Sequence, residues 1–130
     1  MTKQDHIAYW TDLAARDWKV AQNLFASKDY VFCLFLAHLT IEKLSKALWV
    51  HDNLDNTPPR THNILRILDA TTFQRTSSQT TLAATLNNFQ MESRYPGDTA
   101  AVYNATTETF TRDLLRDTLD FRQCLLNKLP

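Results

Sequence analysis

The stretch 30–49, YVFCLFLAHLTIEKLSKALW, is the most apolar part of this chain. Its first half is apolar nearly all round, and its second half is amphipathic, with Glu42, Lys43 and Lys46 set between apolar residues. A helix that is apolar on every side is buried, so we expect this segment to be the central helix of the fold. Glu42 and Lys46 stand four residues apart, a spacing at which opposite charges pair on one helix face.

Apolar residues at helical spacing predict further helices on both sides of this segment. We place them at 10–25, 61–68, 77–89 and about 106–128. Thr61 is the expected N-cap of the short one, and Ser77 or Ser78 that of the next. Long antiparallel helices with short connections pack as bundles. The predicted fold is therefore all-α, an up-and-down bundle of four long helices plus one short helix, in a single domain over 1–130.

The composition excludes several classes of function. Of the 130 residues, 44% are hydrophobic, a share typical of a globular protein. The 14 Lys and Arg residues balance 14 Asp and Glu residues, so no overall electrostatic field attracts the chain to nucleic acid or to an anionic membrane. Gly97 is the single glycine, which excludes a P-loop and a GxGxxG fingerprint. No apolar run approaches the roughly 18 residues of a membrane span. We expect a soluble, cytoplasmic protein with no membrane partner.

The cysteines and histidines predict no metal site and no cofactor. Cys33 and Cys124 lie far apart in apolar surroundings, and we interpret both as core residues of a reducing compartment rather than as a disulfide. The four histidines show no HxxxH pairing, so we expect no zinc site. A GxSxG nucleophile motif is impossible with one glycine, although composition alone does not exclude a catalytic triad.

Two polar residues fall on stripes that should be buried. Asp17 is in register with the apolar face of the first predicted helix, and a buried carboxylate needs a partner, which Lys43, Lys46 or His38 can supply. His38 follows the apolar face of the central helix, where a hydrogen-bonded core histidine is commoner than a catalyst. We interpret Asp17, His38 and Glu42 as structural polar residues, with a polar pocket as the alternative.

Two pairs of residues, each with an arginine, are candidate ligands of a phosphate or nucleotide. Arg60 and His62 precede a predicted helix, whose free backbone N–H groups and dipole attract anions. Arg94 offers a forked donor for phosphate, and the neighbouring Tyr95 offers a ring on which a base can stack. The structural alternatives are a capped helix start at Thr61 and a packed helix stop at Tyr95.

Five segments together resemble the HEPN domain family. They are ARDWKVAQNL (15–24), KDY (28–30), IEKLSKAL (41–48), THNIL (61–65) and SRYPGD (93–98), and the resemblance runs over roughly 8–126. It implies a small α-helical bundle that usually forms a homodimer. It also implies relatedness to the substrate-binding helical domains that accompany small nucleotidyltransferases.

Many members of that family are ribonucleases or toxins of toxin–antitoxin pairs, and these carry an Arg-x4-6-His motif. Here the only histidine soon after Arg60 is His62, with one residue between them, and no histidine follows Arg94 or the later arginines. Acid–base cleavage of RNA needs a proton carrier beside a phosphate-binding cation, and this chain lacks the pair at the family's spacing.

The function expected from the sequence is therefore a non-catalytic, nucleotide-binding HEPN module. It would act as a homodimer with a small nucleotidyltransferase or in a toxin–antitoxin-like pair. The residues expected to line its groove are Lys43, Lys46, Arg60, His62, Arg94 and Tyr95. One alternative is a metal-independent ribonuclease that uses His62 with Arg60, the only case in which RNA is a partner. The other is a structural dimer in which Glu42, Lys43 and Lys46 form solvent-exposed salt bridges along the helix. Its interface would consist of exposed tryptophans.

Overall fold

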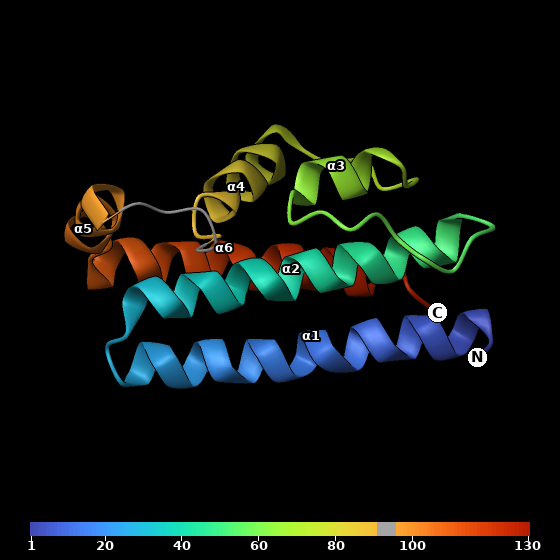
Figure 1. The fold of residues 1–130 in the computed structure, drawn as a ribbon, viewed down its shortest axis with the longest axis horizontal. Coiled ribbons are helices and arrows are strands. Elements are labelled where there is room, and N and C mark those ends of the chain that lie inside the picture. Colours follow the sequence, from blue (N-terminus) through green and yellow to red (C-terminus); the bar gives the residue numbers. More distant parts are fainter. Residues whose placement is uncertain (91–95) are drawn as a thin grey trace.

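The computed structural model describes residues 1–90 and 96–130, and this part of the chain is all-helical, as predicted. It contains six helices and no strand: α1 (Lys3–Ala26), α2 (Tyr30–Asp52), α3 (Ile64–Asp69), α4 (Ser77–Asn87), α5 (Pro96–Ala105) and α6 (Glu108–Leu126) (Figure 1).

The predicted arrangement of four long helices plus one short helix is not confirmed. Over the described residues, α1, α2 and α6 are long, with 24, 23 and 19 residues, whereas α3, α4 and α5 are short. The unexpected helix is α5, which starts at Pro96. Proline has a fixed φ and no N–H, so it stops a preceding helix but suits the first position of a new one. No helix is predicted from the sequence between 89 and 106, so α5 is an addition to the predicted elements.

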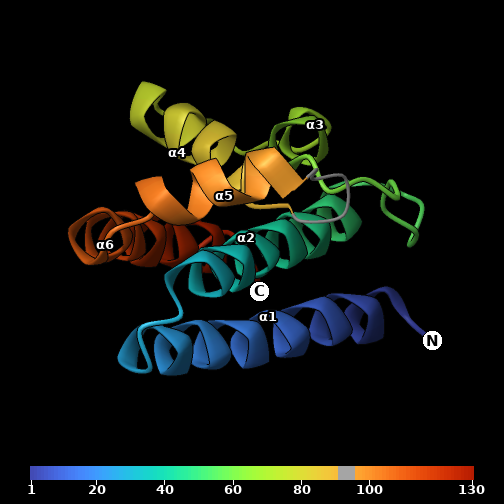
Figure 2. The ribbon, with the colours of Figure 1, turned by 60° about the vertical axis from the view of Figure 1, so that its left-hand side comes forward.

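Helix α2 is central, as its apolar sequence predicts. It contacts every other helix, with α1 along one side and α3 and α4 on the opposite side, while α5 lies near the α1–α2 turn (Figures 1 and 2). Its residues Leu34, Ile41, Leu44 and Leu48 are almost completely buried. The main core also contains buried residues of α1, α3, α4 and α6: Ala14, Ile64, Leu68, Leu82, Leu86, Phe121 and Leu125.

The starts of α1 and α4 are set by capping boxes that were not predicted from the sequence. Thr76 caps α4 instead of Ser77 or Ser78, in a capping box with Gln79. A capping box of Thr2 with Asp5 starts α1 at Lys3, seven residues before the predicted start. In each case the hydroxyl accepts the backbone N–H three residues on, which satisfies a group that the helix leaves unpaired.

Lys3 ties the start of α1 to the end of α2. Its ammonium group donates to the carbonyls of Val50 and Asn53 and to the side chain of Asn56, over 2.8, 2.7 and 2.8 Å. A cation at a helix C-terminus meets the carbonyls that the helix leaves unpaired and the negative end of its dipole. This contact fixes the antiparallel pair α1–α2 at the end where the N-terminus lies (Figure 1).

The described residues contain no helix that is long and apolar enough to cross a membrane. Both cysteines are free. Cys33 is buried, as expected, and burial raises the pKa of its thiol to about 12. Cys124 is exposed, so its assignment to the core was wrong: it lies on the outer side of α6, where only part of the helix surface faces the core.

Candidate functional site

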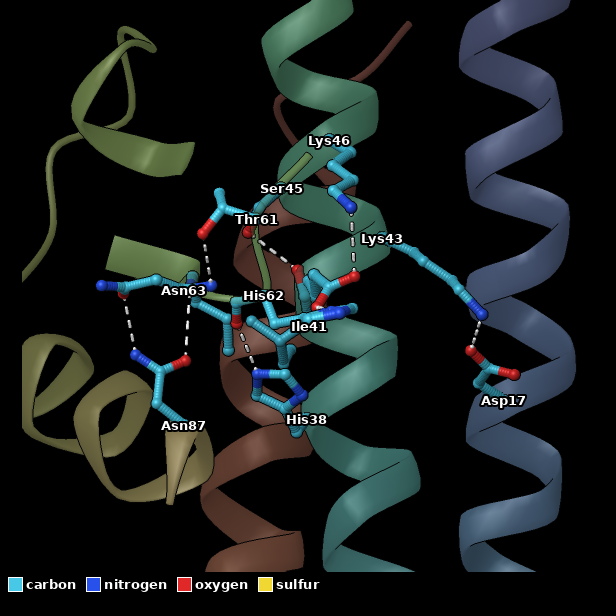
Figure 3. A network of polar contacts seen from close by, with 12 residues as sticks. Asp17, His38, Ile41, Lys43, Ser45, Lys46, Thr61, His62, Asn63 and Asn87 are labelled. Atoms are coloured by element: carbon cyan, nitrogen blue, oxygen red, sulfur yellow. Dashed lines mark hydrogen bonds and ion pairs between the residues drawn. The ribbon is translucent and has the colours of Figure 1, made fainter. Parts of the chain in front are cut away.

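A row of polar side chains crosses the buried centre of α2. His38, Glu42 and Lys46 are spaced four residues apart and lie on one face, which meets the loop that leads into α3 (Figure 3). All three residues are buried, and the most exposed of them, Lys46, is 8% exposed. Buried polar groups need partners, so the contacts of this row decide how the loop is held.

Glu42 is the centre of the network. One carboxylate oxygen accepts from Nδ1 of His62 over 2.9 Å, and the other accepts from Lys46 over 3.2 Å, the i, i+4 pair that the sequence predicts. Because a carboxylate only accepts, Nδ1 of His62 carries the hydrogen. Lys46 also lies 5.2 Å from the centre of the Trp10 ring. The buried carboxylate therefore has both a cationic partner and a hydrogen-bonded one.

His38 holds the backbone of the same loop. It is fully buried, and its Nε2 lies 2.8 Å from the carbonyl oxygen of His62, so Nε2 must donate. Burial lowers the pKa of His38 because it disfavours the charged ring, and this outweighs the opposing effect of the Glu42 charge. His38 is therefore a neutral donor, and His62 is anchored to α2 twice, through its carbonyl and through its ring.

Two asparagines close the start of α3. Asn63 is the N-cap and accepts from the backbone N–H groups of Leu65 and Arg66. Asn87 of α4 accepts from the N–H of Ile64 over 3.2 Å and donates to Asn63 over 2.9 Å. The N–H groups at the start of α3 are therefore paired within the protein, so an anion at this loop would depend on side chains.

Thr61 is not the cap of α3, contrary to prediction. Thr61 stands three residues before Ile64, the first helical residue, and its hydroxyl accepts from the N–H of Asn63 over 3.2 Å. Sequence reasoning missed both Asn63 and Asn87. Asn63 was detectable, because asparagine is a preferred N-cap and stands directly before Ile64. Asn87 was not, because its contact depends on how α4 packs against α3.

Lys43 points away from this row, toward α1, where it contacts Asp17 over 2.5 Å (Figure 3). The two side chains are 19% and 16% exposed. Of the three partners predicted for Asp17, the structure therefore shows Lys43. The pair links α1 to α2, and it lies on a different side of α2 from His62 (Figure 3).

Of the residues expected to line a groove, Arg60 and His62 reach the surface. Arg60 is exposed and has no ion pair within the described part of the chain, and the His62 side chain is 45% exposed. Lys43 and Lys46 are held by Asp17 and Glu42. Arg94 and Tyr95 lie outside the described residues. The described geometry therefore brings His62 to Glu42 and His38, and carries Arg60 on the same loop.

The structural alternative, with solvent-exposed salt bridges of Glu42, Lys43 and Lys46, does not match the burial of these side chains. Glu42 and Lys46 are 3% and 8% exposed, because the loop before α3 and the Trp10 ring cover them. The three tryptophans are not exposed either: Trp18 is buried, and Trp10 and Trp49 are partly buried. Among the described residues, no group of three or more His, Cys, Asp or Glu side chains is arranged to hold a metal ion.

The class of protein follows from comparison with family models. The model described as the HEPN domain matches residues 7–129, nearly the whole chain. The chain belongs to the HEPN domain family, as the resemblance of its motifs indicated. A comparison with curated proteins finds no match, and neither does one with solved structures.

Proposed function

We propose that this HEPN chain is a non-catalytic module that binds a nucleotide at the loop before α3, through Arg60 and His62. The observation that carries the proposal is the double anchor of His62, whose carbonyl is held by His38 and whose ring is held by Glu42. A loop fixed in this way presents its side chains with little loss of conformational entropy on binding, and preorganisation of this kind favours affinity.

The charges near the loop support a phosphate ligand. Lys46 neutralises Glu42, so the carboxylate beside His62 does not repel an incoming anion. Lys43 neutralises Asp17 on another side of α2 (Figure 3). Arg60 adds an exposed guanidinium, whose planar fork matches phosphate oxygens. In this proposal Lys43 and Lys46 act through the carboxylates that they hold. Arg94 and Tyr95 supply a second cation and a stacking surface.

The proposal includes the partners expected from the family resemblance. The module would act as a homodimer beside a small nucleotidyltransferase or in a toxin–antitoxin-like pair in the cytoplasm. The formal net charge of zero supports this form of binding, because the chain has no general attraction for phosphates and depends on a local site or a partner. Light scattering of the purified chain tests the dimer.

The direct test is calorimetric titration of the full chain with ATP and with GTP. Arg60→Ala should weaken binding about tenfold, the effect of removing one charge-assisted contact. His62→Ala should also weaken it about tenfold, because it removes the ring that anchors the loop to Glu42 and so the preorganisation of the site. Arg16→Ala is the matched control, because Arg16 is an exposed arginine on α1. The proposal fails if neither nucleotide binds, or if the control variant weakens binding as much as the other two.

A second candidate function is metal-independent RNA cleavage, and one observation favours it. A buried carboxylate that accepts from Nδ1 of a histidine fixes the ring tautomer, with the hydrogen on Nδ1 and the lone pair on Nε2, as a histidine that accepts a proton requires. His62 with Glu42 has this arrangement. Incubation of an unstructured RNA with the chain in EDTA separates the two functions. Cleavage that His62→Ala abolishes would replace the non-catalytic module by a nuclease, and intact RNA supports the module.

A further inference from the structure

A groove of about 350 Å³ lies between α1 and α6 and shares no residue with the site at the centre of α2. We name it the α1–α6 groove. It is lined by Trp18, Gln22, Phe25, Leu115, Arg116 and Leu119.

The walls of the groove follow from helical spacing. Trp18 and Phe25 stand seven residues apart on α1, and Leu115 and Leu119 stand four apart on α6, so each pair lies on one helix face. Trp18 is buried in a small cluster with Ala21 and Cys33, which makes this wall rigid. Leu119 is 47% exposed although it is apolar. The groove is thus a preformed apolar surface with one side chain left in water.

Guanidinium groups frame these walls. Arg112 lies over the Phe25 ring and Arg122 over the Trp18 ring, each 5.7 Å from the ring centre. Arg116 is the one charged residue that lines the groove. With Leu119 these arginines recur every three or four residues along α6, so they form one stripe on the helix.

The arginines can accept new partners. Arg112 contacts Glu108 over 3.2 Å, and Arg116 contacts Asp113 and Asp117 over 3.5 and 3.8 Å. All three pairs are about half exposed or more, and such pairs contribute little free energy. Arg122 has no ion pair within the described residues, and its contact with Trp18 holds it at the rim. An incoming carboxylate therefore meets a positioned guanidinium that no acid already occupies.

We propose that the α1–α6 groove docks one segment of a partner protein, in which a leucine or phenylalanine is flanked by carboxylates. The apolar side chain would pack between Leu119 and Trp18, and the carboxylates would contact Arg122 and Arg116. Tryptophan and arginine are enriched among the residues that contribute most of the binding energy at protein interfaces. A short segment can place its few carboxylates at Arg122 and Arg116 alone, whereas a phosphodiester chain is negative at every nucleotide and would also meet Asp113 and Asp117. The proposal is independent of the nucleotide site.

The test uses two synthetic amphipathic peptides with leucines on one face, flanked by glutamates in one peptide and by lysines in the other. NMR of the full chain follows the indole N–H of Trp18 and the side-chain N–H of Arg122. We expect the glutamate peptide to shift both signals to saturation and to bind about tenfold tighter than the lysine peptide, because like charges at an interface are strongly disfavoured.

Two matched variants locate the binding. Leu119→Glu should weaken binding of the glutamate peptide about tenfold or more, since it places a charge on the apolar wall. Leu54→Glu makes the same change at a leucine that is 100% exposed in the loop after α2, and it should leave affinity unchanged. Thermal unfolding of both variants establishes that they are folded.

Several results would overturn the proposal. Equal affinity for the two peptides would contradict the role of the arginines, and an unaffected Leu119→Glu variant would contradict the groove. A dimer in light scattering that Leu119→Glu dissociates and Leu54→Glu does not would assign the groove to a second copy of this chain. Cosedimentation with vesicles rich in phosphatidylserine, lost only in Leu119→Glu, would assign it to a lipid surface.

Discussion

The centre of α2 and the α1–α6 groove both combine cations with aromatic rings, but they use them differently. At the centre of α2, Lys46 lies beside the Trp10 ring and is buried with Glu42. At the rim of the groove, Arg122 lies over the Trp18 ring and has no ion pair among the described residues. The first cation holds the protein together, and the second remains at the surface.

The difference shows what burial does to a charge. A buried ion must have its counter-ion within the fold, because the interior does not solvate it. An arginine at a rim keeps its water and can exchange partners. Charged residues at the centre of α2 therefore act on stability and on the position of the loop, whereas those at the surface are available for ligands. The predictions below test this distinction.

The largest effect is expected from Glu42→Ala. This change leaves the ammonium group of Lys46 buried without its counter-ion and releases the ring of His62. Breaking one side of a buried pair costs about 3–5 kcal/mol of unfolding free energy. Urea unfolding measures this quantity. A loss below about 1 kcal/mol, the range of exposed pairs, would contradict the view that Glu42 is the centre of the network.

The pH dependence of stability should identify His38. Its pKa is lowered in the folded state from an ordinary value of 6.5, so the unfolded chain binds the proton more readily. The stabilising contribution is therefore complete above pH 6.5 and is lost as the pH falls below that value. We expect the melting temperature of the wild type to fall between pH 7 and pH 5, and that of His38→Gln to fall less. Parallel curves for the two proteins would contradict this assignment.

A smaller effect is expected from Asp17→Asn, which breaks the partly exposed pair with Lys43. Solvent screens both groups, so the loss of unfolding free energy should be about 1 kcal/mol. Chemical denaturation of Asp17→Asn, Lys43→Met and the double variant measures the coupling between the two residues. Strict additivity of the two single changes would show that the contact contributes nothing.

The smallest effect is expected from Arg122→Ala in the groove. A partly exposed cation over a ring contributes about 0.5–1 kcal/mol, so the variant should unfold almost like the wild type. Thermal unfolding is the measurement. A loss comparable to that of Glu42→Ala would mean that Arg122 is part of the core structure, and the contrast between the two regions would disappear.

The sequence predicted the parts of the fold that depend on local patterns. The apolar run 30–49 identified the central helix, and the spacing of Glu42 and Lys46 identified their ion pair. The start of α5 at Pro96 was not predicted, because the same proline geometry serves a helix stop and a helix start. Local signals therefore fail where one residue type has two roles.

The site was predictable only in part, because its decisive contacts join distant segments. Glu42 and His62 are 20 residues apart, and no local spacing specifies that they meet. Buried threonines are a second example. Thr106, Thr111 and Thr118 donate to the carbonyl four residues earlier, which satisfies their hydroxyls inside the bundle. These side chains could not be placed until the packing of α5 and α6 was known.

The most direct test of the nucleotide site follows the ring signals of the four histidines by NMR during titration with ATP. We expect the His62 signals to shift to saturation, those of His6 and His51 to stay in place, and the shift of His62 to be lost in Arg60→Ala. His38 reports on the anchor and should change little. A saturated titration in which the His62 signals do not move would contradict the central proposal that the loop before α3 holds the ligand.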